Sequence, residues 1–390
     1  MSLEIINATN KSMEQSLEAF LMQHTEYEVQ KYILLYIPPV LLVIGTFGNL
    51  FSFVILLKNT RKASTYSYLS VLAIVDILVL YIGLFNLWIA QFLINVKEMH
   101  RFVCKTATFL GYTCSEISVW LIVAVTIERT IVVLFPLKAP RVCNTKYARI
   151  TITSIIILFA SVNLHFFWSV GLEYTHGNET TVVECKAREN YTQLVEQIWP
   201  WVDAAMYSFS PFVVIFVLNL IIILNVISAR KARLMLRQQS SLARPGRHKH
   251  SQEHGEMSRR ITFMLLAVSF TFLITTLPKN IYIIYTSFNK AQDIELEIES
   301  LLKRKLIDTI AEMLMYTNHS INFFLYCATG KKFRGQVRAL VCACATKRYP
   351  GGLRNLSQRS NPSSLRLWKS YSTKTDYVNC SQVIHREVQL

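Results

Sequence analysis

The chain has 390 residues, of which 52% are hydrophobic and only 17% are charged, and its formal net charge is +16. Soluble domains carry about 25% charged residues, so this composition argues against a large soluble enzyme and favours a membrane protein. The sequence contains no nucleophile elbow, phosphate-binding loop or metal-spaced His/Cys cluster, so we expect no enzymatic activity, no cofactor and no nucleic-acid partner.

Residues 1–31 form a polar segment before the first apolar stretch. They lack a basic region followed by an apolar core, which is the pattern of a cleavable signal. We therefore expect the first apolar stretch to direct insertion and 1–31 to be an extracellular, glycosylated segment. N-x-[ST] sequons occur on this predicted outer side at Asn7, Asn10, Asn178 and Asn190.

Seven apolar stretches follow, separated by polar connections. Each is long enough to cross roughly 30 Å of hydrocarbon as a helix of about 20 residues, and the backbone of such a segment must hydrogen-bond within itself. The sequence therefore predicts an all-α membrane protein in which 32–328 form a seven-transmembrane helix bundle. The stretches are 32–57, 66–93, 105–134, 150–170, 198–228, 261–288 and 306–327.

Lysine and arginine concentrate in alternate connections. The connection 229–260 contains nine of them and the residues after 327 contain twelve, while 135–149 contains four and no acid. Because basic residues favour the cytoplasmic side, these segments are predicted to be cytoplasmic, where they would also contact anionic lipid. We expect a plasma-membrane protein whose amino terminus is extracellular.

Two of the eight cysteines lie on the predicted outer side. Cys104 begins the third apolar stretch and Cys185 lies in the connection before the fifth, so both face an oxidising compartment in which disulfides persist. This location predicts a disulfide between them. The alternative is two unrelated buried thiols.

A basic amphipathic segment, GKKFRGQVRALVCAC (330–344), follows the seventh stretch. We expect 329–345 to form a short amphipathic helix 8 on the inner leaflet, with Cys342 and Cys344 available for palmitoylation; inert thiols are the alternative. Residues 346–390 are low in apolar residues and contain several serines, which predicts a disordered cytoplasmic tail that phosphorylation would charge.

The third stretch ends in a charged pair, Glu128 and Arg129, within AVTIERTIVVL (124–134). From Cys104 to Arg129 is 25 residues, roughly 37 Å of helix, so the two lie at opposite membrane faces. Over 32–345 the chain resembles a rhodopsin-like G protein-coupled receptor. The resemblance implies that Arg129 pairs with Glu128 in the inactive state and meets a heterotrimeric G protein when the sixth helix moves outward. The alternative is a solvated interfacial ion pair.

Asp76 is the only charged residue of the second stretch. An isolated carboxylate at bilayer depth implies a bound cation or a proton. The resemblance implies an allosteric sodium ion, the only non-protein group that we expect, and a neutral, protonated Asp76 is the alternative. The family's sodium positions are occupied by Asp76, Ser118, Asn318 and Asn322.

Other family markers occur along the helices, with two departures. Thr276 replaces the usual tryptophan of the sixth helix, and Phe323 replaces the usual proline of the seventh. Pro278 still predicts a kink, whereas the loss of the second proline is expected to reduce one. The resemblance assigns roles in activation to Glu128, Arg129, Asn219, Phe272, Pro278, Asn322 and Tyr326.

Charged and aromatic residues gather in the outer halves of the predicted helices. Intramembrane charges usually face the bundle interior and pair, so Lys279 is expected to be neutralised by Glu116 or Glu312; a static ion pair is the alternative to a ligand contact. Acids outnumber bases there, which favours a ligand with a cationic group such as arginine. The predicted ligand-binding residues are Trp88, Tyr112, Glu116, Asp203, Lys279, Tyr282, Asp308 and Glu312.

The run NHSINFFLYC (318–327) and Asn219 are most similar to invertebrate FMRFamide-type neuropeptide receptors. That resemblance implies a short amidated extracellular peptide as ligand, a heterotrimeric G protein as partner, and arrestin binding after tail phosphorylation. The alternatives are a ligand-independent orphan receptor and an ion-coupled membrane transporter, although we find no internal repeat of the transporter kind.

Overall fold

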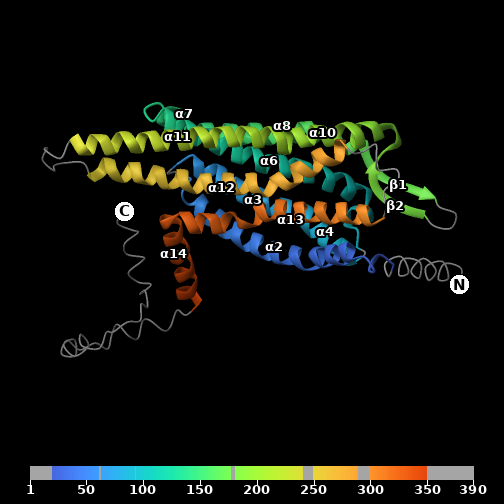
Figure 1. Cartoon of the computed structure of the whole chain (residues 1–390). Helices are drawn as coiled ribbons and strands as arrows, with labels where there is room; N and C mark the ends of the chain where they lie inside the picture. Colours follow the sequence, from blue (N-terminus) through green and yellow to red (C-terminus); the bar gives the residue numbers. More distant parts are fainter. Residues whose placement is uncertain are drawn as a thin grey trace, which may run out of the picture. The chain divides into compact units, whose positions relative to one another are not determined.

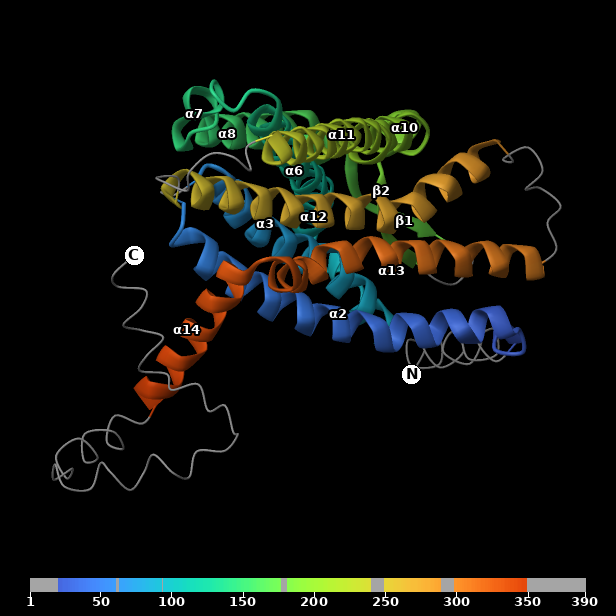
Figure 2. The same ribbon diagram turned by 60° about the vertical axis from the view of Figure 1, so that its left-hand side comes forward.

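The computed structural model describes residues 20–60, 63–92, 94–176, 181–239, 249–288 and 298–348 (Figures 1 and 2). The predicted glycosylation sites Asn7, Asn10 and Asn178, and the tail from 349 onward, lie outside the described residues. The chain divides into two compact units, 1–325 and 326–390, which we describe separately.

Long helices joined by short elements make up the first unit. In chain order the elements are α2 (Thr25–Leu57), α3 (Thr65–Val79), η1 (Leu80–Phe85), α4 (Asn86–Ile89), η2 (Ala90–Phe92), α5 (Val96–Met99), α6 (Arg101–Leu134), α7 (Ala139–Val142), α8 (Thr145–Asn163), α9 (Phe166–Ser169), β1 (Val170–His176), β2 (Thr181–Ala187), η3 (Glu189–Tyr191), η4 (Gln193–Ile198), α10 (Trp199–Asp203), η5 (Ala204–Phe209), α11 (Ser210–Gln239), α12 (Lys249–Phe288) and α13 (Ile298–Thr329).

Six helical segments of the described residues are long and apolar enough to cross a membrane. They overlap the first six predicted stretches, and α13 contains the more polar seventh. Several helices extend beyond the apolar residues: α2 begins at Thr25, before the expected start at 32, and α12 begins at Lys249. Hydropathy marks the part of a helix that lies in hydrocarbon, whereas backbone hydrogen bonding continues into polar sequence.

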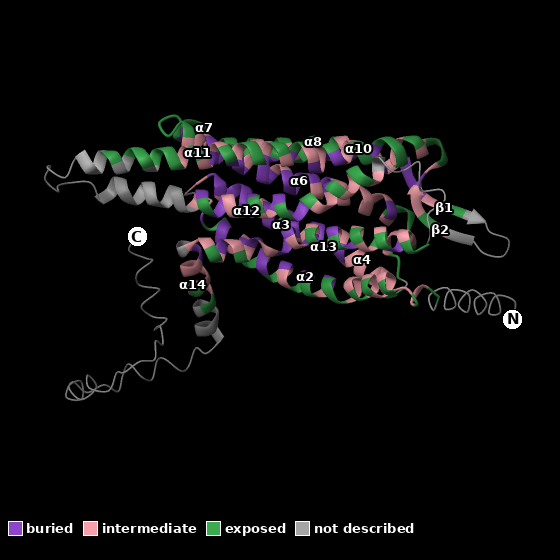
Figure 3. Ribbon diagram, viewed as in Figure 1, coloured by how far each residue is buried: buried purple, intermediate pink, exposed green. Residues whose placement is uncertain are grey.

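Helix α6 lies at the centre of the bundle and packs against α3, α8, α11 and α12 (Figures 1 and 2). Buried residues follow the inner faces of the helices, while exposed residues follow the outer faces (Figure 3). The outer faces are nevertheless apolar, as expected of helices surrounded by lipid rather than water. Their exposed side chains include Val43, Phe47, Ile157, Val213, Leu224 and Ile274.

Two glycines bring α2 close to α13. A Cβ atom on Gly45 would lie 3.0 Å from Ser320 Oγ, and one on Gly48 would lie 3.0 Å from the Cβ of Phe323. Small residues let helix backbones approach closely in membranes. The approach allows the Asn49 side-chain amide to donate to the backbone carbonyl of His319, at 2.8 Å.

Strands β1 and β2 form a two-stranded antiparallel hairpin within the polar connection that precedes the fifth apolar stretch (Figure 1). Its register places Leu172 opposite Cys185 and Val170 opposite Ala187, so apolar side chains share one face. That face packs with Phe166 and Trp199 around Cys104. The alternation of apolar and polar residues in these two strands is too short to distinguish them from a loop by sequence pattern alone.

In the second unit, helix α14 (Lys331–Arg348) follows Gly330. The Tyr326 and Phe333 rings meet edge to face at 5.5 Å, and Arg334 donates to the backbone carbonyls of Cys327 and Ala328. These contacts satisfy carbonyls at the end of α13 that have no partner within the helix. Cys342 and Cys344 belong to α14, but their side chains lie outside the described residues.

Candidate functional site

A disulfide joins Cys104 at the start of α6 to Cys185 in β2, as predicted. It links residues separated by 81 positions and anchors the hairpin to the helix. The predicted glycosylation site Asn190 is exposed in η3, close in sequence to this hairpin. We refer to this part of the bundle as the disulfide end.

Glu116 lies 12 residues beyond Cys104, about 18 Å along α6 from the disulfide. Its side chain is fully buried, and its Oε2 atom accepts a 2.5 Å hydrogen bond from Asn163 of α8. The other oxygen, Oε1, has no hydrogen-bond partner among the described residues. Asp203 of α10 is near enough to repel it electrostatically. Glu116 therefore does not neutralise Lys279, contrary to one of our two expectations.

Lys279 of α12 instead forms an ion pair with Asp308 of α13, and its ammonium lies 5.7 Å from the ring centroid of Tyr282. Glu312, one turn along α13 from Asp308, interacts electrostatically with this pair and with Lys97. Lys97 belongs to α5, outside the spanning helices, and burial lowers its pKa while Glu312 opposes that shift. Each of these four side chains therefore interacts with one of opposite charge.

Besides Tyr282, two aromatic residues were predicted to bind ligand, and they lie in different surroundings. Tyr112 of α6 stacks on Phe166 at 4.7 Å and meets Trp199 edge to face, so it belongs to the cluster beneath the hairpin. Trp88 of α4 donates from its indole nitrogen to the carbonyl of Leu35 in α2. Both side chains are partly buried and have structural partners.

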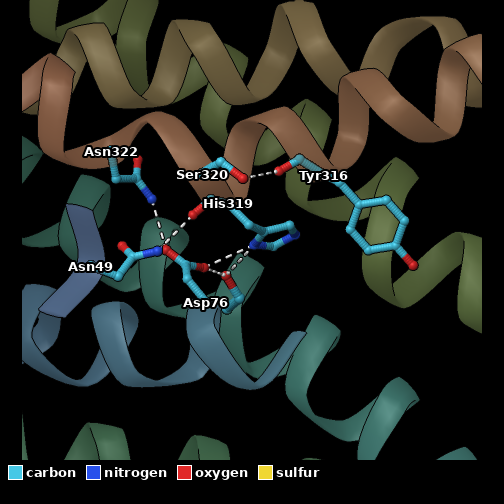
Figure 4. Close-up of polar contacts among 7 residues, drawn as sticks. Asn49, Asp76, Tyr316, His319, Ser320 and Asn322 are labelled. Atoms are coloured by element: carbon cyan, nitrogen blue, oxygen red, sulfur yellow. Dashed lines mark hydrogen bonds and ion pairs between the residues drawn. The ribbon is translucent and has the colours of Figure 1, made fainter. Parts of the chain in front are cut away.

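Hydrogen bonds join three of the four predicted sodium residues, Asp76, Ser118 and Asn322 (Figure 4). Asp76 Oδ1 accepts from Ser118 Oγ at 2.8 Å, and its Oδ2 accepts from Asn322 Nδ2 at 2.8 Å. The amide oxygen of Asn318 is buried without a partner among the described residues. A further side chain, His319, also contacts Asp76 Oδ1 at 2.8 Å and was missed in the sequence. This arrangement does not fit a sodium ion, because the Ser118 hydroxyl, the His319 ring and the Asn322 amide already occupy the Asp76 carboxylate.

At the opposite end of α6 from the disulfide, Arg129 pairs with its neighbour Glu128 at 3.1 Å. Glu128 Oε1 also accepts a 2.5 Å hydrogen bond from the hydroxyl of Thr65, at the start of α3. Both charged residues are buried, and Arg129 Nε has no hydrogen-bond partner among the described residues. The pair is therefore not a solvated surface contact. Thr65 was missed because its role depends on helix packing.

The remaining predicted activation residues lie on α11 and α12. Asn219 is buried with both amide atoms lacking partners among the described residues, and Phe272 is fully buried. Pro278 lies inside α12, and the Thr276 hydroxyl donates to the carbonyl of Phe272 within the same helix. Between α6 and α12, the hydroxyls of Thr126 and Ser269 lie 3.3 Å apart.

Comparison with known proteins assigns the chain to a family. The family model described as 7 transmembrane receptor (rhodopsin family) matches residues 48–326. This chain belongs to the rhodopsin family of seven-transmembrane receptors. The match covers the helices that carry Asp76, Glu128, Arg129 and Asn322, and the family is a receptor family rather than an enzyme family.

Relatives of this receptor include named peptide and hormone receptors. Sex peptide receptor-related protein 2 of Caenorhabditis elegans is 25% identical over 79% of this receptor and 71% of its own length. Growth hormone secretagogue receptor type 1 of Sus scrofa is 26% identical over 86% of both chains. The thyrotropin-releasing hormone receptor of Gallus gallus is 26% identical over 86% of this receptor and 85% of its own length. The receptor is thus a multi-pass membrane protein.

Proposed function

We propose that this receptor is activated by an extracellular peptide with a cationic group and promotes nucleotide exchange on a heterotrimeric G protein. Its relatives include a protein named as related to a sex peptide receptor, a growth hormone secretagogue receptor and a thyrotropin-releasing hormone receptor. The amino terminus and the disulfide end face the outside, and the end with Arg129 faces the cytoplasm, as the distribution of basic residues favours.

The excess of acid at the disulfide end is the observation that supports a cationic ligand. Lys279 is neutralised by Asp308, and Glu312 interacts with Lys97, which leaves Glu116 and Asp203 in the same half of the bundle. Glu116 is the more buried of the two, and one of its oxygens has no hydrogen-bond partner among the described residues. Burying a carboxylate is costly unless it is paired or protonated, so a ligand guanidinium or amine would relieve that cost when it binds. A short amidated peptide supplies such a group without adding a terminal carboxylate.

The direct test is a panel of short synthetic peptides applied to cells that express the full chain, with G protein activation as the readout. Each peptide would be made as an amide and as a free acid, and with arginine or with citrulline, which keeps the shape but loses the charge. Activation by an amidated arginine peptide, weaker with citrulline, is expected. High basal signalling that no peptide changes would instead support the ligand-independent receptor.

Glu116→Gln should lower peptide potency by about 10- to 100-fold. Glutamine can still accept the hydrogen bond from Asn163, so the variant removes charge with little change in packing. A hydrogen bond to a charged group contributes about 1.5–3 kcal/mol, and each 1.4 kcal/mol changes affinity tenfold. Dose–response curves measure the effect, and Glu184→Gln on the exposed hairpin, paired with Lys186, is the control. If the peptide is equally potent on wild type and on both variants, Glu116 does not contribute to ligand binding.

Charge reversal at Lys279 separates a ligand contact from a static pair. Lys279→Glu is expected to reduce potency at least tenfold, because it adds a like charge beside Asp308. The exchange variant, Lys279→Asp with Asp308→Lys, restores the pair with reversed polarity and should recover surface expression but not potency. If the potency of the exchange variant stays within about threefold of wild type, the difference in binding free energy is under ~0.7 kcal/mol. The ion pair would then only hold α12 to α13.

A further inference from the structure

His319 is a fully buried histidine that has no part in the proposed ligand or G protein contacts. It lies on α13 between Asn318 and Ser320, and its ring points toward Asp76 of α3 and Ser118 of α6 (Figure 4). Its backbone carbonyl accepts from Asn49 of α2 at 2.8 Å. One residue therefore connects α13 to three other helices.

The Asp76 carboxylate has little capacity left for a metal ion. Each carboxylate oxygen can accept about two hydrogen bonds. Oδ1 accepts from Ser118 Oγ and from His319 Nδ1, both at 2.8 Å, and Oδ2 accepts from Asn322 Nδ2 at 2.8 Å. Oδ1 is thus fully occupied, and the imidazole lies where an ion bound to that oxygen would have to approach.

The chemistry of the ring also differs from that of an alkali-ion ligand. Hard cations are bound by oxygen atoms, whereas an N–H group repels them. With Asp76 ionised, the contact requires a proton on Nδ1, which the imidazole carries in one neutral tautomer as well as when charged. A buried carboxylate must be hydrogen-bonded or paired, and His319 supplies that partner permanently.

We propose that His319 takes the place of a cation at Asp76, so that the stability and the signalling of this receptor do not respond to sodium. The junction of α3, α6 and α13 is then held by a covalently attached side chain rather than by an exchangeable ion. Two amide oxygens beside the junction, from Asn318 and Asn322, are buried without partners in the described part of the chain. Replacing the imidazole by a small hydroxyl would open space beside those oxygens and convert the junction into a sodium site.

The test compares thermal unfolding of the purified full-length receptor in sodium chloride and in N-methyl-D-glucamine chloride, each at about 0.15 M so that ionic screening is equal. The wild-type midpoint should change by less than about 1 °C, whereas His319→Ser should unfold at least about 3 °C higher in sodium, as expected for an ion that binds only the folded state. Adding Asp76→Asn to His319→Ser should remove the gain.

Ser320→Ala is the matched control, because the Ser320 hydroxyl donates to the Tyr316 carbonyl within α13 and does not contact Asp76. Its midpoint of thermal unfolding should change with sodium as little as that of the wild type. A saturable sodium stabilisation of the wild type that Asp76→Asn abolishes would overturn the proposal, whether or not any His319 variant folds. If His319→Ser folds and its unfolding midpoint does not rise in sodium, the role of His319 is overturned. His319→Asn is a second variant for the same comparison.

Discussion

Arg129→Ala should abolish peptide-stimulated G protein activation while surface expression persists. Arg129 has buried donors that are only partly used, since its Nη2 atom meets Glu128 and its Nε has no partner among the described residues. A guanidinium that exchanges Glu128 for acceptors of a G protein gains charge-assisted hydrogen bonds, and alanine offers none. Nucleotide exchange in membranes at saturating peptide should fall to the unstimulated level, a loss of at least about tenfold, equal to 1.4 kcal/mol.

Two further variants show whether Glu128 and Thr65 restrain Arg129. Glu128→Gln removes the charge that holds Arg129, and Thr65→Val removes the 2.5 Å hydrogen bond to Glu128, so both should raise basal activity. Arg141→Ala on the exposed surface of α7 removes an equal charge from the same end of the bundle and should signal normally. Full signalling by Arg129→Ala would refute the role assigned to it.

Cys185→Ser should strongly reduce the amount of receptor at the cell surface. The disulfide closes a loop of 81 residues, for which chain entropy in the unfolded state gives a stabilisation of about 4 kcal/mol. That is a large part of the free energy of unfolding of a typical domain, which is roughly 5–15 kcal/mol. Without the bond, the hairpin would lose its covalent link to α6, and the cluster of Phe166 and Trp199 around Cys104 would loosen.

Surface labelling and the thermal midpoint of the solubilised receptor measure this effect. Cys104→Ser should behave like Cys185→Ser, and the double variant should be no worse than either, because both remove the same bond. Cys327→Ser, at a free and partly buried cysteine, is the control and should be delivered normally. Normal surface delivery and unchanged peptide binding of Cys185→Ser would contradict a structural role for the disulfide.

The order and type of the long helices follow from the amino-acid sequence alone. A segment in lipid must satisfy its own backbone, so a long apolar stretch has few alternatives to a helix, and the stretches from 32 to 327 are helical over nearly all of their described residues. The positions of Cys104 and Cys185 relative to those stretches were sufficient to predict the disulfide. The family, too, could be identified from Glu128, Arg129 and the spacing of the other markers.

Contacts between helices required the tertiary structure. Glu116 or Glu312 was expected to neutralise Lys279, yet Lys279 forms its ion pair with Asp308, while Glu116 accepts a hydrogen bond from Asn163 on α8. His319 contacts Asp76, 243 positions away, although among the residues of α13 only its neighbours Asn318 and Asn322 were assigned to that site from the sequence. Helical periodicity tells which residues share a face, but the rotation and tilt of each helix decide which face meets which. Those are set by packing, as where Gly45 and Gly48 let α2 approach α13.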